Sequence, residues 1–479
     1  MWIGLAVLVL ALTPAQIKGI DRFVAAEMAV THVPGAAVGV YDRGTIVLAK
    51  GYGLANVELN VPVKPQTIFQ SGSVGKQFTA AAIMMLVEEG LISLDDSIVK
   101  YFPDAPASWK PIRIRNLLSH TSGLSEYATD ALAGPGGPFD LRRDYTEDQL
   151  VAKIEALPIE SAPGEKWVYR NTNYVLLGVI IHRVSGKFYG EFLAERIFRP
   201  LGMTSTRIIS ETDIVPNRAA GYVWNSLALQ NQDWVAPSIN TTADGSLYFN
   251  VLDLAKWDAA LSTTELLSQS SLKRMWTVYR LNDGKPNDGQ YGFAWRIHAF
   301  HGRLVVEHSG AWQGFTCNIT RYVDDALTVV VLTNLDSDHS RPDYMARVIA
   351  GLADPRLLPQ RLAKIDDHQP SIERSLVGVL DAIQSGTPLD ARAGAEFNGF
   401  TQGDAAQLRR QLAPLWPGGS LTLVARAPSA DDSSLLLSQF RLRKGTHAML
   451  VTFGLDAAGK VQSLLFEPDR AYRGFDLYG

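Results

Sequence analysis

"FQSGSVGKQFTAAAIMMLVEEG", from Phe69 to Gly90, is the stretch of sequence that decides the fold of this chain. Its apolar residues recur at helical spacing and Gly90 suits the left-handed position that ends a helix, so we predict a helix from Val74 to Glu89. Lys76 falls in the first turn, where the helix dipole disfavours a cation. Ser73 lies three residues earlier and therefore on the same side of the helix.

The pair Ser73 and Lys76 forms an S-x-x-K motif, which is typical of one kind of serine nucleophile. A serine hydroxyl reacts poorly until a base takes its proton. Burial near the positive end of a helix favours the neutral form of a lysine amine, which can act as that base. The ordinary alternative is that Ser73 caps the helix while Lys76 reaches solvent.

A second alternative interprets "SGSVG", from Ser71 to Gly75, as the nucleophile elbow of an α/β-hydrolase. That motif has glycine where this chain has Ser71, and it requires an acid and a histidine later in the chain rather than a lysine in the next turn. We therefore rank it below the S-x-x-K interpretation.

A tyrosine and an asparagine occur in "APGEKWVYRNTNYVLLGVIIHRVSG", from Ala162 to Gly186. We predict an extended segment at residues 169–171, followed by a helix that ends at Gly186. In an extended segment Tyr169 and Asn171 point the same way and Arg170 points the opposite way. A phenol near a cationic lysine loses its proton more easily and can serve as general base and then general acid. Each residue alone is equally typical of ordinary packing or helix capping.

A third motif lies in "VEHSGAWQGF", from Val306 to Phe315. An extended His308-Ser309-Gly310 would line a cleft, and its glycine would let a substrate backbone approach closely. The backbone N–H groups of Ala311 and Ser73 could then form an oxyanion hole. His120 in "LLSHTSGL" receives no catalytic role, because its hydroxyl-rich surroundings are typical of turn capping.

The order and separation of these three motifs resemble the serine β-lactamase and penicillin-recognising hydrolase superfamily, in its class C-like branch. The likeness covers roughly residues 20–351 and extends to "IRIRNLLSHTSGL", "IFRPLGMTSTR", "ADGSLYFNVLDLAKW" and "YGFAWRI". It implies Ser73 as the acylated nucleophile and Lys76 and Tyr169 as the acid–base pair. It also implies substrate-binding and oxyanion roles for Asn171, His308, Ser309, Gly310 and Ala311.

The resemblance implies a serine hydrolase that acts through an acyl-enzyme on an amide or ester, with a small-molecule or peptide substrate. We expect a D-residue peptidase or an esterase. Efficient class C β-lactamases carry lysine in the place of His308, and a histidine is only partly charged near neutral pH. A β-lactamase and a slowly acylating penicillin-binding sensor remain the alternatives.

The composition sets limits on the class of protein. The chain has 479 residues, of which 46% are hydrophobic and 20% charged, as is typical of a globular protein with two domains. A net charge of -4 with scattered basic residues argues against a nucleic-acid partner. The one cysteine, Cys317, excludes an internal disulfide. No metal-binding or phosphate-loop motif occurs, so we expect no metal and no cofactor.

The organisation along the chain predicts an α+β protein. Residues 1–15 are expected to be a cleaved signal peptide, which implies export to the periplasm or the extracellular space; a buried N-terminal helix is the alternative. The apolar run is too short for a stable membrane span. Residues 20–355 are expected to form a β-lactamase-like mixed sheet flanked by helices, with an all-helical subdomain. Residues 371–479 are expected to form a small α+β domain of helices and strands. The sequence is compatible with a homo-oligomer.

Overall fold

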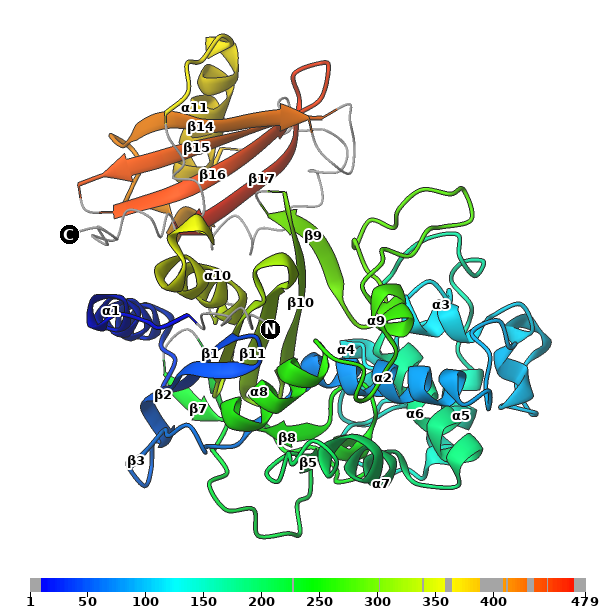
Figure 1. Ribbon diagram of the computed structural model, residues 1–479. Coiled ribbons are helices and arrows are strands. Elements are labelled where there is room, and N and C mark those ends of the chain that lie inside the picture. Colours follow the sequence, from blue (N-terminus) through cyan, green and yellow to red (C-terminus); the bar gives the residue numbers. More distant parts are fainter. Residues whose placement is uncertain are drawn as a thin grey trace, which may run out of the picture. The chain divides into compact units, whose positions relative to one another are not determined.

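The computed structural model describes residues 10–225, 228–300, 302–337, 340–357, 364–387, 408–410, 412–428, 435–445 and 447–468 (Figure 1). The chain divides into two compact units, Met1–Leu358 and Pro359–Gly479. Each unit is described by itself.

The first unit contains a seven-stranded sheet with the order β3-β2-β1-β12-β11-β10-β9. The first and last long strands of the unit meet at its centre, as predicted, where Val38 lies opposite Val331. All neighbouring strands are antiparallel, whereas we expected a mixed sheet. Short turns join the neighbours in sequence, and a short turn can join only antiparallel strands. The strands are β1 (Gly35–Asp42), β2 (Thr45–Asn56), β3 (Val61–Pro62), β9 (Arg296–Phe300), β10 (Arg303–Trp312), β11 (Phe315–Tyr322) and β12 (Leu327–Thr333).

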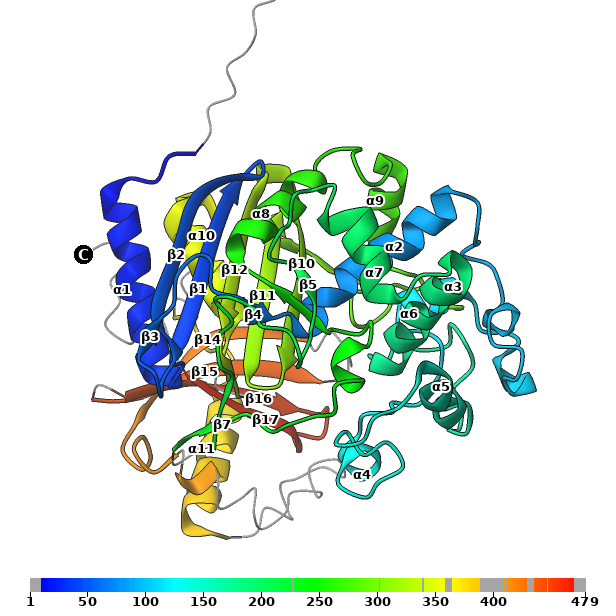
Figure 2. The same ribbon diagram turned by 90° about the horizontal axis from the view of Figure 1, so that it is seen from below.

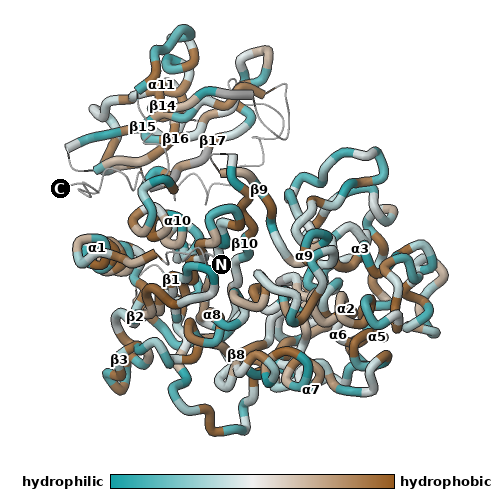
Figure 3. Tube along the Cα trace, viewed as in Figure 1, coloured by the Kyte–Doolittle hydropathy of each residue, from teal (hydrophilic) through white to brown (hydrophobic). Residues whose placement is uncertain are grey.

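Helices cover both faces of this sheet (Figures 1 and 2). Helix α10 (Pro342–Ala353) lies on one face and packs against α1 (Pro14–Thr31), while α8 (Val251–Ala260) lies on the other. Every residue of β1 and β12 is buried, and alternate side chains enter the two separate hydrophobic clusters. In Figure 3 the hydrophobic segments of this unit follow the central strands and α1.

An all-helical layer lies beside the sheet and is built around two largely buried helices, α2 (Lys76–Glu88) and α6 (Asn171–Ser185). The 3-10 turn η1 (Gly72–Gly75) precedes α2. Both helices are followed by the glycines predicted to end them, Gly90 with φ 73° and Gly186 with φ 70°. The other helices of the unit are α3 (Ile114–Leu118), α4 (Asp130–Ala133), α5 (Glu147–Glu155), α7 (Tyr189–Leu193) and α9 (Gln269–Met275).

The unit also contains two small three-stranded sheets. In one, β8 (Leu247–Phe249) pairs with β4 (Phe69–Gln70) and β5 (Arg207–Ile208), and this sheet holds the chain just before η1. In the other, β6 (Tyr222–Trp224) pairs with β7 (Leu229–Asn231) and, in parallel, with β13 (Leu335–Asp336).

The N-terminal segment bears on the expected signal peptide. Residues 1–9 lie outside the described residues. Thr13 is the N-cap of α1, with its hydroxyl accepting the N–H of Gln16, and the helix begins at Pro14. In the described part of the chain, no helix combines the length and the apolar character needed to cross a bilayer.

The second unit is a helix on an antiparallel sheet. Helix α11 (Pro370–Ser385) and four strands enclose a core that includes Leu376, Leu380, Phe440 and Phe453. The described part of this unit contains helix and strand as expected, and a further helical stretch is described only at residues 408–410 and 412. The strands, in their order in the sheet, are β14 (Ser420–Pro428), β15 (Leu436–Lys444), β16 (His447–Leu455) and β17 (Val461–Pro468).

Candidate active site

Lys76 is the best-connected side chain of the site. It is fully buried, and its Nζ lies 2.8 Å from Oγ of Ser73, 2.9 Å from Oδ1 of Asn171 and 2.5 Å from the backbone oxygen of Asp244. The amine thus has three oxygen atoms within hydrogen-bond distance. The alternative in which Lys76 reaches solvent is therefore wrong.

The chain enters η1 through Ser71, which has a structural role. Its buried hydroxyl donates to the backbone oxygen of Gly245 at 2.8 Å and accepts the N–H of Leu247 at 3.1 Å. This contact fastens the turn to β8. The strands beside this turn are antiparallel, whereas the nucleophile elbow of an α/β-hydrolase requires a parallel sheet. The elbow interpretation therefore does not fit this fold.

Glycines allow η1 and β10 to touch through their backbones. A Cβ on Gly72, which has φ 43°, would lie 2.5 Å from the backbone nitrogen of Ala311. A Cβ on Gly310 would lie 2.8 Å from the backbone nitrogen of Ser73. The contact thus brings together the two amides that the sequence predicts for an oxyanion hole. Gly245 packs on Gly72 in the same way, since its Cβ would lie 2.6 Å from the Gly72 carbonyl carbon.

Tyr169 and Asn171 both face Lys76, as the predicted alternation requires. Nζ of Lys76 lies 5.0 Å from the centre of the Tyr169 ring, and Arg170 between them is extended, with φ -140° and ψ 122°. The guanidinium of Arg170 turns instead to Glu160 at 2.5 Å. Within the described part of the chain, the buried hydroxyl of Tyr169 has no hydrogen-bond partner.

His308 is a neutral, buried imidazole. Its Nδ1 lies 2.6 Å from the backbone oxygen of Ser309, which can only accept, so Nδ1 carries the proton. Nε2 then accepts the hydroxyl of Tyr291 at 2.8 Å. Burial and, next, the positive charge of Lys76 lower the pKa of His308 to about 3. The expectation that this histidine is partly charged near neutral pH is therefore wrong. It holds for an exposed side chain, whereas His308 is buried.

His120 lies directly behind Tyr169, with the two ring centres 4.2 Å apart. The side chain is 1% exposed, and its Nδ1 accepts the backbone N–H of Arg170 at 3.2 Å. The sequence predicted only turn capping around it, and Ser119 and Thr121 do form such contacts. The contact between His120 and Tyr169 left no signal in the sequence, because the two residues are far apart along the chain.

Two carboxylates accompany the buried lysine. Glu126 accepts the backbone N–H of Asn171 at 2.5 Å, and burial raises the pKa of its carboxyl group. Asp244 accepts the hydroxyl of Tyr127 at 3.3 Å through its side chain. Across the described ranges, no group of three or more His, Cys, Asp or Glu side chains is arranged to hold a metal ion.

A cleft of about 1060 Å³ opens onto this arrangement. Arg296 lines it, with its guanidinium 5.5 Å from the Trp167 ring, and it makes no ion pair with any described residue. Another sector of the cleft is lined by Glu307 and Arg347, which pair at 3.1 Å. Two of the eight predicted site residues, Lys76 and Asn171, do not line the cleft. The other six do: Ser73, Tyr169, His308, Ser309, Gly310 and Ala311.

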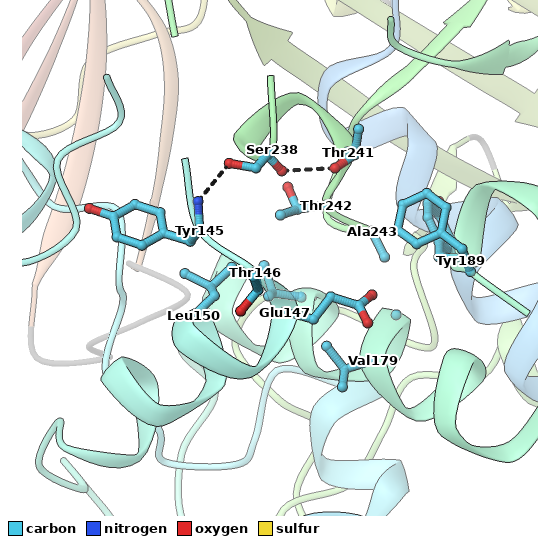
Figure 4. Close-up of a pocket in the computed structure, with 13 residues that line it drawn as sticks. Tyr145, Thr146, Glu147, Leu150, Val179, Tyr189, Ser238, Thr241, Thr242 and Ala243 are labelled. Carbon is cyan, nitrogen blue, oxygen red and sulfur yellow. Dashed lines mark hydrogen bonds between the residues drawn. The ribbon is translucent and has the colours of Figure 1, made fainter. Parts of the chain in front are cut away.

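A second, smaller cavity of about 50 Å³ is separate from the cleft (Figure 4). It lies between the start of α5 and the segment 238–243, where Ser238 accepts the N–H of Tyr145 at 2.9 Å. The cavity shares no lining residue with the cleft. Its volume suits a few water molecules, and none of the predicted site residues faces it.

Comparison with known proteins gives the following relatives. A family model described as Beta-lactamase matches residues 20–354. The chain is 31% identical over 322 residues to penicillin-binding protein 4* of Bacillus subtilis (strain 168), covering 64% of this chain and 69% of that protein. It is 28% identical over 308 residues to a D-aminopeptidase of Gluconobacter oxydans (strain 621H), covering 63% of this chain but only 56% of the relative.

A solved structure resembles almost the whole chain. The octameric penicillin-binding protein homologue from Pyrococcus abyssi superimposes with a TM-score of 0.63 at 25% identity, covering 95% of this chain and 98% of that one. Its match therefore extends beyond the residues of the family model into the second unit.

Proposed function

Because this chain belongs to the beta-lactamase family, we infer that it is a serine hydrolase that cleaves an amide or ester bond through an acyl-enzyme on Ser73. One observation carries the proposal: the fully buried Nζ of Lys76 is joined to Oγ of Ser73 and to Oδ1 of Asn171. A lysine whose amine is buried in this way interacts with neighbouring side chains and does not contribute to the charged, solvated surface.

Acylation uses the neutral amine of Lys76. The amine keeps its hydrogen bonds to Asn171 and Asp244 and takes the hydroxyl proton of Ser73, as Oγ bonds to the substrate carbonyl carbon. The N–H groups of Ser73 and Ala311 bind the oxyanion. Tyr169 passes a proton to the leaving nitrogen or oxygen as its bond to carbon breaks. The product is an ester on Ser73 and a free amine or alcohol.

Deacylation reverses these roles with water as the nucleophile. Tyr169, which gave up its proton during acylation, takes a proton from the water while the water oxygen bonds to the acyl carbon. The ester bond then breaks, Oγ of Ser73 recovers its proton from Lys76, and a carboxylic acid leaves. A protein that only reports on penicillin needs no such step, so the position of Tyr169 beside Lys76 favours an enzyme over a slowly acylating sensor.

The substrate we favour is a short D-residue peptide, a D-aminoacyl amide or an acyl ester. The relative from Gluconobacter oxydans is a D-aminopeptidase, and the neutral, buried His308 supplies no cation to a substrate carboxylate. A β-lactamase or carboxypeptidase is the second candidate. It rests on Arg296, whose guanidinium lines the same cleft without an ion pair among the described residues.

A substrate panel tests the proposal. Purified protein is assayed with D-aminoacyl amides, D-Ala-D-Ala peptides, short-chain p-nitrophenyl esters and nitrocefin. We expect turnover of amides or esters that exceeds turnover of nitrocefin. Faster nitrocefin turnover, abolished in Arg296→Ala, would move the assignment to the second candidate. A persistent penicillin adduct in intact-mass spectra, with no turnover of any substrate, would support the sensor.

Three further features of the protein are proposed on the same grounds: its domains, its export and its oligomeric state. We take the unit Met1–Leu358 as the catalytic domain and Pro359–Gly479 as an appended domain. Export is tested by sequencing the N-terminus of the protein recovered from its native cell. The Pyrococcus abyssi homologue is octameric, and a homo-oligomer of this chain is tested by light scattering of the full-length protein.

A further inference from the structure

His120 adopts a backbone conformation that is uncommon for residues other than glycine. Its φ is 58°, in the left-handed region, although the residue carries a side chain. The conformation lets one residue grip the Tyr169 segment twice: its backbone oxygen accepts the N–H of Val168 at 3.0 Å, and its Nδ1 accepts the N–H of Arg170 at 3.2 Å. The residues on both sides of Tyr169 are thus held by His120.

The hydrogen bonds define the state of the imidazole. A backbone N–H can only donate, so Nδ1 of His120 must be an acceptor and the neutral ring carries its proton on Nε2. Asn173 donates to the same Nδ1 at 3.1 Å, and its own Oδ1 accepts the hydroxyl of Ser122 at 2.6 Å. Burial and the charge of Lys76 lower the pKa of His120 well below its ordinary value, which keeps Nδ1 free to accept.

The ring of His120 also supports the ring of Tyr169. The two ring centres are 4.2 Å apart at an interplanar angle of 36°, and Tyr291 lies on another side of His120 at 4.9 Å. The hydroxyl of Tyr169 has no hydrogen-bond partner in the described part of the chain, so no bond to that oxygen holds it in place. Its orientation then depends on the backbone contacts and the ring stack.

We propose that His120 is the positioning residue of Tyr169: it fixes the backbone on both sides of the tyrosine and presents the phenol to Lys76 and Ser73. This inference rests on the proposed function, in which Tyr169 transfers a proton. Proton transfer needs the donor and acceptor at hydrogen-bond distance, and a small misplacement of either is costly in rate. His120 itself exchanges no proton in this account.

The test compares two substitutions of His120. Asn tolerates a left-handed backbone, and its Oδ1 can accept an N–H in place of Nδ1, whereas Gly tolerates the backbone but offers no acceptor. We expect His120→Gly to lower kcat for a p-nitrophenyl ester by about 10- to 100-fold with little change in KM. We expect His120→Asn to recover most of that loss. An Asn variant as impaired as the Gly variant would overturn the proposal.

A matched control separates strain and stacking from catalysis. His32 also has a left-handed backbone, with φ 60°, and its ring stacks at 3.8 Å on Trp224, yet it does not line the cleft. His32→Gly should leave kcat within about twofold of the parent protein. A similar fall in kcat from His32→Gly and His120→Gly would contradict a specific effect on Tyr169.

Coupling to Tyr169 distinguishes positioning from a general structural role. In a Tyr169→Phe background the phenol is gone, so His120→Gly should cost less than about threefold in residual kcat. An undiminished effect in that background would overturn the proposal even if the variant is less stable. If Ser73→Ala retains activity, the proposed function fails; if Ser73→Ala is inactive and His120→Gly is fully active, only the present inference fails.

Discussion

The side-chain nitrogen of Lys76 lies 2.8 Å from the hydroxyl oxygen of Ser73 in a position that is closed to solvent. Acyl transfer through Ser73 requires a base within hydrogen-bond distance of this hydroxyl, and the amine of Lys76 is at that distance. The other partners, Asn171 and Asp244, offer only oxygen acceptors and so cannot take the serine proton in its place.

Replacing Lys76 by Met should remove the base and keep a chain of similar length. We expect kcat/KM for a p-nitrophenyl ester to fall by about 10²- to 10⁴-fold, the usual contribution of a positioned acid–base group. Lys50→Met is the control, because Lys50 makes an ion pair with Asp21 and does not line the cleft. A Lys76→Met protein within threefold of the parent rate would contradict the assignment.

Tyr169→Phe should separate activity from stability. The substitution removes one buried oxygen that lacks a described partner, so the free energy of unfolding should stay the same or rise. The value of kcat should fall by about 10²- to 10⁴-fold. Tyr291→Phe provides the contrast, since it breaks the bond to Nε2 of His308 and should cost about 1–3 kcal/mol in urea unfolding. A fully active Tyr169→Phe protein would rule out the phenol as proton carrier.

Gly72→Ala should damage the oxyanion hole. The new Cβ would fall 2.5 Å from the backbone nitrogen of Ala311, which is backbone and cannot rotate aside. We expect loss of activity of about 10²-fold or more, measured as kcat/KM, from displacement of that N–H. Gly90→Ala is matched to it, with a left-handed φ of 73° but nothing within 4 Å of the new Cβ. Equal activity of the two variants would contradict the proposed hole.

Acid should destabilise the protein through His308. Its folded pKa of about 3 lies below the unfolded value near 6.5, so between these pH values the unfolded chain binds a proton that the folded protein does not. Stability is therefore complete above about pH 6.5 and falls toward pH 3, by up to about 1.4 kcal/mol per pH unit for this group. His308→Gln should make the urea midpoint less dependent on pH in that range. An unchanged slope would show that His308 titrates normally.

Local spacing was sufficient to predict much of the site. The helical rule places Ser73 beside Lys76, and the extended rule turns Tyr169 and Asn171 to one side with Arg170 on the other; the structure has both arrangements. The helix predicted from Val74 to Glu89 was likewise visible from the spacing of its apolar residues, and the structure has the 3-10 turn η1 followed by α2 in its place.

Contacts between distant segments explain what the sequence did not reveal. The carbonyl of Asp244 accepts from Lys76, but a backbone oxygen has no side-chain signature. The lowered pKa of His308 comes from burial and from Lys76, and the role of His120 depends on the Tyr169 segment. The direction of the strands was missed for a similar reason, since apolar runs report burial and not the partner strand.

The most direct test of the account is the site of covalent labelling by a fluorophosphonate. The parent protein, incubated with the probe and analysed by intact-mass and peptide mass spectrometry, should gain one adduct on the peptide that contains Ser73. Ser73→Ala should gain none and should hydrolyse no ester or amide above background. An adduct on another residue, or undiminished turnover by Ser73→Ala, would contradict acyl transfer through Ser73.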